Sequence, residues 1–250
     1  MAGLYGQNTT INRNNKPERE AATAHKVLLI PFEPKLYMGE IDLYIHQETK
    51  LTAREIKFKF RDGINDQLYK AFKLANYNTL DLMEDTTKYR KDIEGIYQYL
   101  SYSFQKIPDQ ENYQAPKKEQ PQQKKIEKGQ LNVETNEQAR FMNARLTSPK
   151  LVPLLYGKYK TDVFVFINQL DIRATGYQAP GDPANINQNR KITVHYTVYN
   201  LDAKEINSGV AEEEFPSDLN NPKKIIDRHF SKIAATIVQR VNKGLAALPK

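Results

Sequence analysis

Apolar residues along the chain form continuous runs, alternating segments and helical stripes. The continuous runs Val27–Phe32 and Thr161–Ile167 are of the kind that is buried on both faces of a sheet, so each predicts a central strand. Another strand is predicted at Asn78–Met83. From 192 to 198 apolar and polar residues alternate, which predicts an antiparallel strand with one exposed face and a returning strand at 205–213.

Helical patterns separate these strands. Thr52 and Glu55 have capping-box spacing, and the apolar stripe behind them predicts a helix over 53–75. Gly63 interrupts that helix at about 1 kcal/mol, which indicates close packing there. Other helices are expected at 38–49, at 87–106, after Ser148-Pro149, and as a long C-terminal helix from Asn221-Pro222.

This order of elements predicts one split α/β domain. Strand, helix, strand and helix in succession favour a parallel βαβ start. The expected fold is a mixed sheet of about five strands, with a C-terminal β-hairpin and a long C-terminal helix packed on the sheet. We divide the chain into a flexible N-terminus (1–24), a first half (25–106), a disordered polar insertion (107–138) and a second half (139–250).

The net charge of +7 raises the question of nucleic-acid binding. Much of the excess positive charge lies in the polar insertion, for example at Lys117, Lys118 and Lys124. The rest is scattered over helix faces that are expected to be exposed to solvent. The chain has no cysteine, which excludes disulfides, thiolate metal sites and cysteine catalysis. No window approaches the roughly 18 apolar residues of a membrane span.

No catalytic residue, metal site or cofactor is predicted. Phosphate loops, nucleophile elbows and zinc-protease motifs are absent from the sequence. Asp81, Glu84 and Asp85 follow a predicted strand and could form a carboxylate site, but Asp85 or Thr86 is better explained as the cap of the next helix. His195 falls on the polar face of its strand and is expected at the surface.

Two features suggest binding instead. The loop around 174–189 is rigidified by prolines, and loops of that kind often carry recognition. Its candidate partner-binding residues are Tyr177, Gln178, Pro180, Asp182 and Pro183. Tyr97, Tyr99 and Tyr102 could alternatively stack nucleic-acid bases, although Tyr97 also lies on the apolar stripe of its helix.

The N-terminal residues favour export. Gly6 before the polar Gln7 is similar to the end of a secretory signal peptide, so cleavage before Gln7 is expected, with the true gene start upstream of Met1. An ordinary N-terminal segment would explain the same residues. The Asn- and Tyr-rich composition resembles uncharacterised secreted proteins of Bacteroidetes-type bacteria.

The element order resembles a known group of envelope domains. The Val27–Phe32 run with its Pro-Phe ending, the leucine helix leading into Tyr159–Val165, and the hairpin before the last helix are similar to the amino-terminal domain of TolB. Related domains occur in the curli secretion protein CsgG and the lipoprotein LpoB. The resemblance covers about 25–245 without the insertion. The chain departs from it by the helices at 38–49 and 87–106, the insertion, and the lack of a lipobox cysteine.

That resemblance implies a non-enzymatic periplasmic or outer-membrane-associated accessory protein that acts by protein–protein binding, with a protein partner in the cell envelope. The alternative is a nucleic-acid-binding module that uses the basic insertion and exposed tyrosines. A third reading is an enzyme with a carboxylate site near Asp81–Asp85.

Overall fold

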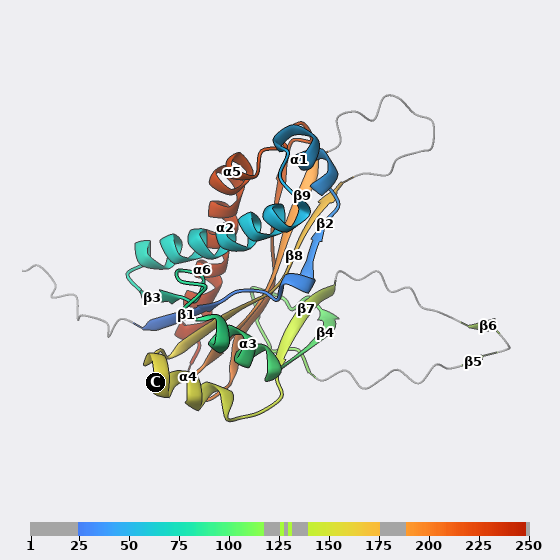
Figure 1. The fold of residues 1–250 in the computed structure, drawn as a ribbon. Helices are drawn as coiled ribbons and strands as arrows, with labels where there is room; N and C mark the ends of the chain where they lie inside the picture. The colour runs from blue at the N-terminus through green and yellow to red at the C-terminus, as the bar shows by residue number, and fades with distance from the viewer. Residues whose placement is uncertain (1–24, 118–125, 128–129, 132–139, 176–188, 249–250) are drawn as a thin grey trace, which may run out of the picture.

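A computed structural model describes residues 25–117, 126–127, 130–131, 140–175 and 189–248. A mixed sheet forms its centre, with helices on both faces (Figure 1). The strand order is β10 (Glu205–Phe215), β9 (Arg190–Asn200), β8 (Val163–Ala174), β1 (Lys26–Ile30) and β3 (Asn78–Asp81). The expected α/β fold, with a mixed sheet of about five strands and a C-terminal hairpin, is confirmed; with one further short strand, the described sheet has six strands.

The sheet combines the two kinds of pairing that the sequence predicted. β1 pairs in parallel with both β3 and β8, whereas β8, β9 and β10 pair in antiparallel order. The four apolar residues Val27–Ile30 are almost wholly inaccessible, because both faces of β1 are covered. A short strand, β2 (Tyr37–Gly39), also pairs in parallel with β8, beyond the end of β1.

One face of the sheet is covered by α2 (Ala53–Leu74) and by the C-terminal helix. α2 begins at the predicted capping box, in which the Thr52 side chain accepts from Glu55 N–H and the Glu55 carboxylate accepts from Thr52 N–H. The C-terminal helix consists of α5 (Pro222–Ile225), a π-helical turn at Ile226–Phe230 and α6 (Ser231–Ala246). Asn221 caps it, as expected, by accepting from Lys224 N–H at 3.2 Å. The rings of Phe60 and Phe230, 5.8 Å apart, join the two helices over the core.

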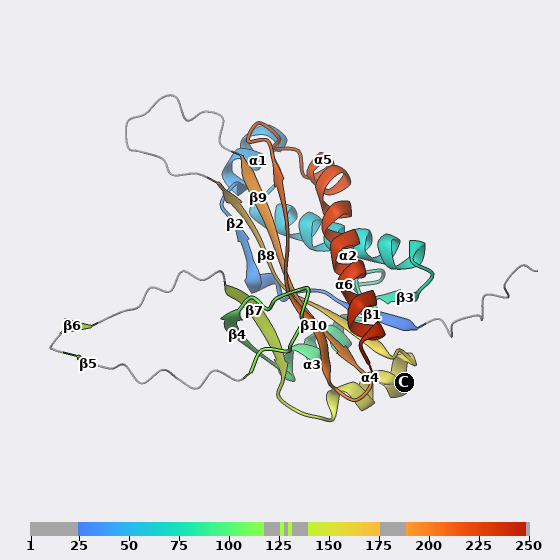
Figure 2. The same cartoon turned by 180° about the vertical axis from the view of Figure 1, so that it is seen from behind.

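The opposite face carries α3 (Arg90–Gln98) and α4 (Leu151–Tyr159), and α1 (Asp42–Thr49) lies near the start of α2 (Figure 2). Ile93, Ile96 and Val152 pack on Phe164 and Phe166 of β8. α1 and α4 lie within or near their predicted ranges. α4 begins at Leu151 rather than at Pro149, and the Ser148 hydroxyl accepts from the N–H of Lys150 at 3.2 Å.

The prediction of a helix over 87–106 is wrong for the second half of this range. After α3 ends at Gln98 the chain forms the strand β4 (Leu100–Lys106), which pairs in antiparallel order with β7 (Arg140–Leu146). Leu100 and Phe104 fit a helical stripe, but together with Tyr102 they also alternate with polar residues as a strand does. Pairing with β7, across the insertion, decides between the two.

The β4–β7 ribbon stands on the main sheet through one edge of β7. Ala144 N–H donates to Thr197 Oγ1 at 3.3 Å, and the Ala144 carbonyl accepts from the Tyr199 hydroxyl at 2.8 Å. Asn168 Nδ2 donates to the Met142 carbonyl at 2.8 Å. Side chains of β8 and β9 therefore satisfy the backbone groups of β7 that β4 does not reach.

The prediction that His195 lies at the surface is wrong, because the β4–β7 ribbon packs over it. The ribbon covers this face of β9, and only 3% of His195 is exposed. Its Nδ1 accepts from Met142 N–H at 2.9 Å, so the proton of the neutral ring lies on Nε2, 3.5 Å from Asp171 Oδ2. His195 therefore anchors the ribbon.

Residues 107–117, which the sequence placed in the disordered insertion, pack against β10. Gln110 Nε2 donates to the Ser208 carbonyl at 2.8 Å, and the Tyr113 hydroxyl donates to Glu205 Oε1 at 2.7 Å. The expectation of disorder is therefore wrong for this part. The described remainder of the insertion consists of 126–127 and 130–131, which pair as β5 (Ile126–Glu127) and β6 (Gln130–Leu131). The rest of 118–138 and the N-terminal 1–24 lie outside the described residues.

The outer edge of β10 is protected from pairing with another strand. Gln110 Nε2 donates a hydrogen bond to the carbonyl of Ser208, and Arg240 Nη1 donates to the carbonyl of Val210. Between them Gly209 has φ +144°, which breaks the regular strand conformation. Devices of this kind prevent a sheet edge from templating a further strand.

Glycines in two helices give opposite expectations for the same substitution. A Cβ on Gly244 of α6 would lie 2.5 Å from the backbone oxygen of Ile206, whereas a Cβ on Gly95 of α3 would meet no atom within 4 Å. Gly95→Ala should raise the free energy of unfolding by about 0.5–1 kcal/mol through helix propensity. Gly244→Ala should lower it by a net value of about 1 kcal/mol, because overpacking exceeds that gain. Urea unfolding of both variants measures the two signs, and stabilisation by Gly244→Ala would contradict the close packing of α6 on β10.

Candidate functional site

A groove between α2 and α6 is the candidate functional site. The helices meet closely at Gly63, where a Cβ would lie 2.6 Å from Ile226 Cδ1. Close packing at Gly63, expected from the sequence, is therefore present. Farther along, the Tyr77 hydroxyl donates to the Asn242 side chain. Between these two contacts the facing residues include Ala71, Ala75 and Ala235, and these short side chains leave space between the helices.

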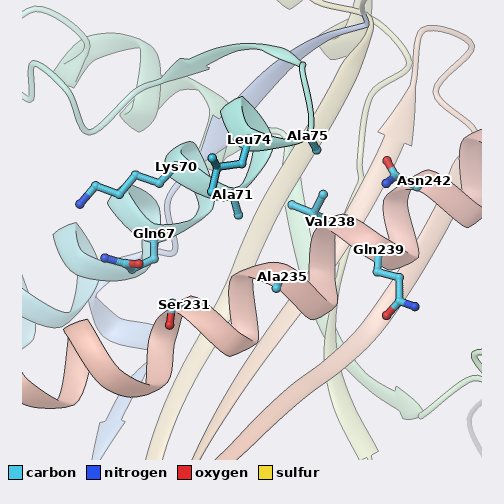
Figure 3. Close-up of a pocket in the computed structure, with 10 residues that line it drawn as sticks. All are labelled: Gln67, Lys70, Ala71, Leu74, Ala75, Ser231, Ala235, Val238, Gln239 and Asn242. Carbon is cyan, nitrogen blue, oxygen red and sulfur yellow. The ribbon is translucent and has the colours of Figure 1, made fainter.

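The groove has a volume of about 440 Å³ and a mainly apolar surface (Figure 3). The apolar part comes from small or aliphatic side chains of both helices: Ala71, Leu74, Ala75, Ala235 and Val238. Val238 is buried, whereas 86% of Leu74 is exposed. Leu74 therefore places a large apolar side chain in solvent beside a concave apolar surface.

Polar side chains border this surface. Gln67 lies on α2, and Ser231, Gln239 and Asn242 lie on α6 (Figure 3). Lys70 is the single ionisable residue of the lining, and its ammonium pairs with Asp66 of the same helix at 2.6 Å. The lining thus offers neutral donors and acceptors around an apolar centre, which suits docking of an amphipathic surface.

The carboxylates after β3 do not come together as an acid–base pair. Asp81 is buried, and its Oδ1 accepts from Asn65 Nδ2 at 2.7 Å and from Met83 N–H at 2.9 Å. Burial raises the pKa of Asp81 to about 6, against the lowering effect of these hydrogen bonds. Glu84 and Asp85 are exposed. Asp81 therefore holds the turn after β3.

The alternative explanation of Asp85 is correct only in part. Its Oδ1 accepts from the N–H groups of Thr87 and Lys88, at 3.1 and 2.9 Å, in the turn that leads to α3. The residue that flanks the first turn of α3 is Tyr89, and the helix itself begins at Arg90. Asp85 thus stabilises the approach to the helix rather than its first turn.

The three tyrosines near residue 100 do not form a stacking surface. The Tyr97 hydroxyl donates to the carbonyl of Pro31 at 2.8 Å and accepts from Arg61 Nη2 at 2.8 Å. Burial raises the pKa of Tyr102, and the nearby Glu33 carboxylate raises it further. Tyr99 alone is exposed, with 36% of its surface accessible. Tyr97 and Tyr102 are thus engaged within the fold.

The loop proposed from the sequence, Tyr177 to Pro183, lies outside the described residues. Within the part of the chain that the structure describes, no group of three His, Asp or Glu side chains is arranged to hold a metal ion. None of the helices in that part combines the length and apolar character needed to span a membrane.

Sequence reasoning missed the groove. The helical stripe assigned Ala71 and Ala75 to the core, and it left Leu74, just beside them on α2, unexplained. An apolar residue off the buried stripe, next to small residues on it, was a usable signal. The contribution of α6 could not be seen, because the two helices are far apart in sequence.

The chain is a mixed α/β protein with an apolar groove between two helices on one face of its sheet. No family model matches the sequence, and no curated protein matches it. Among solved structures, the crystal structure of lipoprotein GNA1162 from Neisseria meningitidis aligns over 90% of this chain and 99% of that chain. The TM-score is 0.31 and the identity 11%, so this likeness carries no argument about function.

Proposed function

We propose that this chain is a non-enzymatic accessory protein of the bacterial cell envelope, periplasmic or outer-membrane-associated, that binds another protein in the α2–α6 groove. The observation that carries the proposal is the exposure of Leu74 beside an apolar hollow of about 440 Å³. A single exposed leucine is ordinary on a protein surface. A leucine next to a concave apolar surface with a polar border is typical of an interaction site.

The groove suits an amphipathic helix of the partner. Helix-in-groove recognition inserts apolar side chains spaced three and four residues apart into a cleft of this kind. The hollow of about 440 Å³ can take large apolar side chains of such a helix, and Leu74 would pack beside them. The amides of Gln67, Gln239 and Asn242 can donate or accept, so they could satisfy polar groups at the edge of that helix.

The compartment is supported by the sequence. The small residue Gly6 before Gln7 and the similarity of element order to exported α/β domains both favour export. A chain without cysteine folds in an oxidising compartment with no risk of mispaired disulfides.

Two matched variants test the proposal. Leu74→Asp places a charge in the groove, and Leu201→Asp makes the same change at a leucine that is 41% exposed in the turn between β9 and β10. Affinity isolation from the envelope fraction of the native host should recover one partner protein with the wild type and with Leu201→Asp. Recovery with Leu74→Asp should fall at least about tenfold, the equivalent of about 1.4 kcal/mol of binding free energy.

Equal recovery of the same partner with Leu74→Asp would exclude the groove as the binding site. Intact protein found only in the cytosol, or nucleic acid as the co-isolated species, would overturn the proposed function. Circular dichroism of both variants confirms that the comparison is made between folded proteins.

A further inference from the structure

The outer edge of β4 carries backbone groups that no described residue pairs with. Met142 and Ala144 of β7 direct their N–H and C=O groups to the main sheet, so the residues between and beside them pair with β4. The register opposes Ser103 to Asn143, and antiparallel pairs alternate along a ribbon. The backbone groups of Tyr102 and Phe104 consequently point away from β7. Within the described residues no hydrogen bond to them is found.

This edge is exposed, and among the described residues none protects it as other sheet edges are protected. Half of the Phe104 side chain is accessible, and the whole ribbon stands out from the sheet face (Figures 1 and 2). The outer edge of β10 is closed by Gln110 and Arg240, and β3, at the other end of the main sheet, is only four residues long. β4 has seven residues and carries one charge, on Lys106. Proteins usually block such an edge unless a strand pairs with it.

We propose that β4 pairs in antiparallel order with β4 of a second copy of this chain, so that two ribbons form a four-stranded sheet across a two-fold axis. The axis passes beside Ser103, the midpoint of Leu100–Lys106. Tyr102 then lies opposite Phe104 of the second copy, and Leu100 lies opposite Lys106. All seven residues of β4 are paired, and a closed dimer results.

The sequence of β4 is self-complementary in this register. Tyr102 and Phe104 both direct their backbone groups outward, so opposing them forms the hydrogen-bonded pairs that an antiparallel ladder requires. The two aromatic side chains come to lie across from each other, a favourable cross-strand contact. Lys106 faces Leu100 of the other copy, so like charges do not oppose each other. A second copy of the chain therefore pairs with the outward backbone groups of β4, and no strand from another protein is needed.

A cysteine at the axis tests this register directly, because the native chain has no cysteine. In Ser103→Cys the two thiols occupy a non-hydrogen-bonded pair with Cα atoms about 4.5 Å apart, within disulfide range. In the control, Ser101→Cys, the thiols are offset by four residues along the strand, or about 13 Å, and cannot bond. Ser101 is the more exposed of the two, so random collision would favour the control.

We expect the wild type to sediment as a dimer and Ser103→Cys to form a disulfide-linked dimer under mild oxidation, at least tenfold faster than Ser101→Cys. Phe104→Lys, which places a charged residue on the edge, should sediment as a folded monomer. A monomeric wild type at all concentrations, or equal cross-linking of the two cysteine variants, would overturn the proposal. The β4 edge lies on the opposite face of the sheet from the groove, so Leu74→Asp should leave the dimer intact.

Discussion

Replacing Ile237 by alanine should lower the free energy of unfolding by about 2–5 kcal/mol. Ile237 has no exposed surface and lies in the core between α6 and the sheet, among residues such as Ile233 and Val241. Truncation removes buried apolar atoms and leaves a cavity that the closely packed surroundings cannot fill. Chemical denaturation at constant temperature measures the loss.

Gln239→Ala is the matched control for this substitution. Gln239 lies two residues farther along the same helix and is exposed, so its truncation should change the free energy of unfolding by no more than about 0.5 kcal/mol. A loss of under about 0.5 kcal/mol for Ile237→Ala would mean that this side of α6 does not pack on the sheet. The groove, which the opposite positions of the helix form, would then be misplaced as well.

The ionisation of Asp81 should make the wild type less stable as the pH rises from about 4 to about 6. Burial raises the pKa of this carboxyl from its ordinary 3.8 to about 6, so in this interval the folded chain holds a proton that the unfolded chain has released. Stability therefore decreases with increasing pH, by about 3 kcal/mol in total for a rise of about two pKa units. Below about pH 3 both states are protonated and the effect vanishes.

Comparison with Asp81→Asn isolates this contribution from the other carboxylates. Asparagine keeps an oxygen for the N–H of Met83 and the amide of Asn65, and it does not titrate. The free energy of unfolding of the wild type minus that of Asp81→Asn should fall by about 3 kcal/mol between about pH 3 and pH 7. A flat difference across this range would show that Asp81 ionises in the folded protein as it does in solvent.

Local signals predicted much of the fold. The Thr52 capping box marked the start of α2, Asn221-Pro222 marked the start of the C-terminal helix, and the apolar runs at Val27 and Val163 marked the central strands. Each of these features depends on residues close together in sequence, or on burial of both faces of one strand. Sequence periodicity reports such features directly.

Features that depend on distant partners could not be predicted in the same way. The sequence of β4 has the pattern of a helix end, and it forms a strand because it pairs with β7, which lies beyond the insertion in sequence. His195 has the pattern of a surface residue because the ribbon that covers it is remote in sequence. The groove is formed by two helices, α2 and α6, that are separated in sequence by most of the domain. These features are set by tertiary contacts, which override local preference.

Site-specific photo-crosslinking in living host cells tests binding in the groove most directly. A photoreactive amino acid at position 74 should form an adduct with one other protein in the envelope fraction, and the same amino acid at position 201 should not. Mass spectrometry of the adduct identifies the partner and the helix that contacts Leu74. Failure of the folded protein to form any protein adduct from position 74, or identical adducts from both positions, would contradict partner binding in the α2–α6 groove.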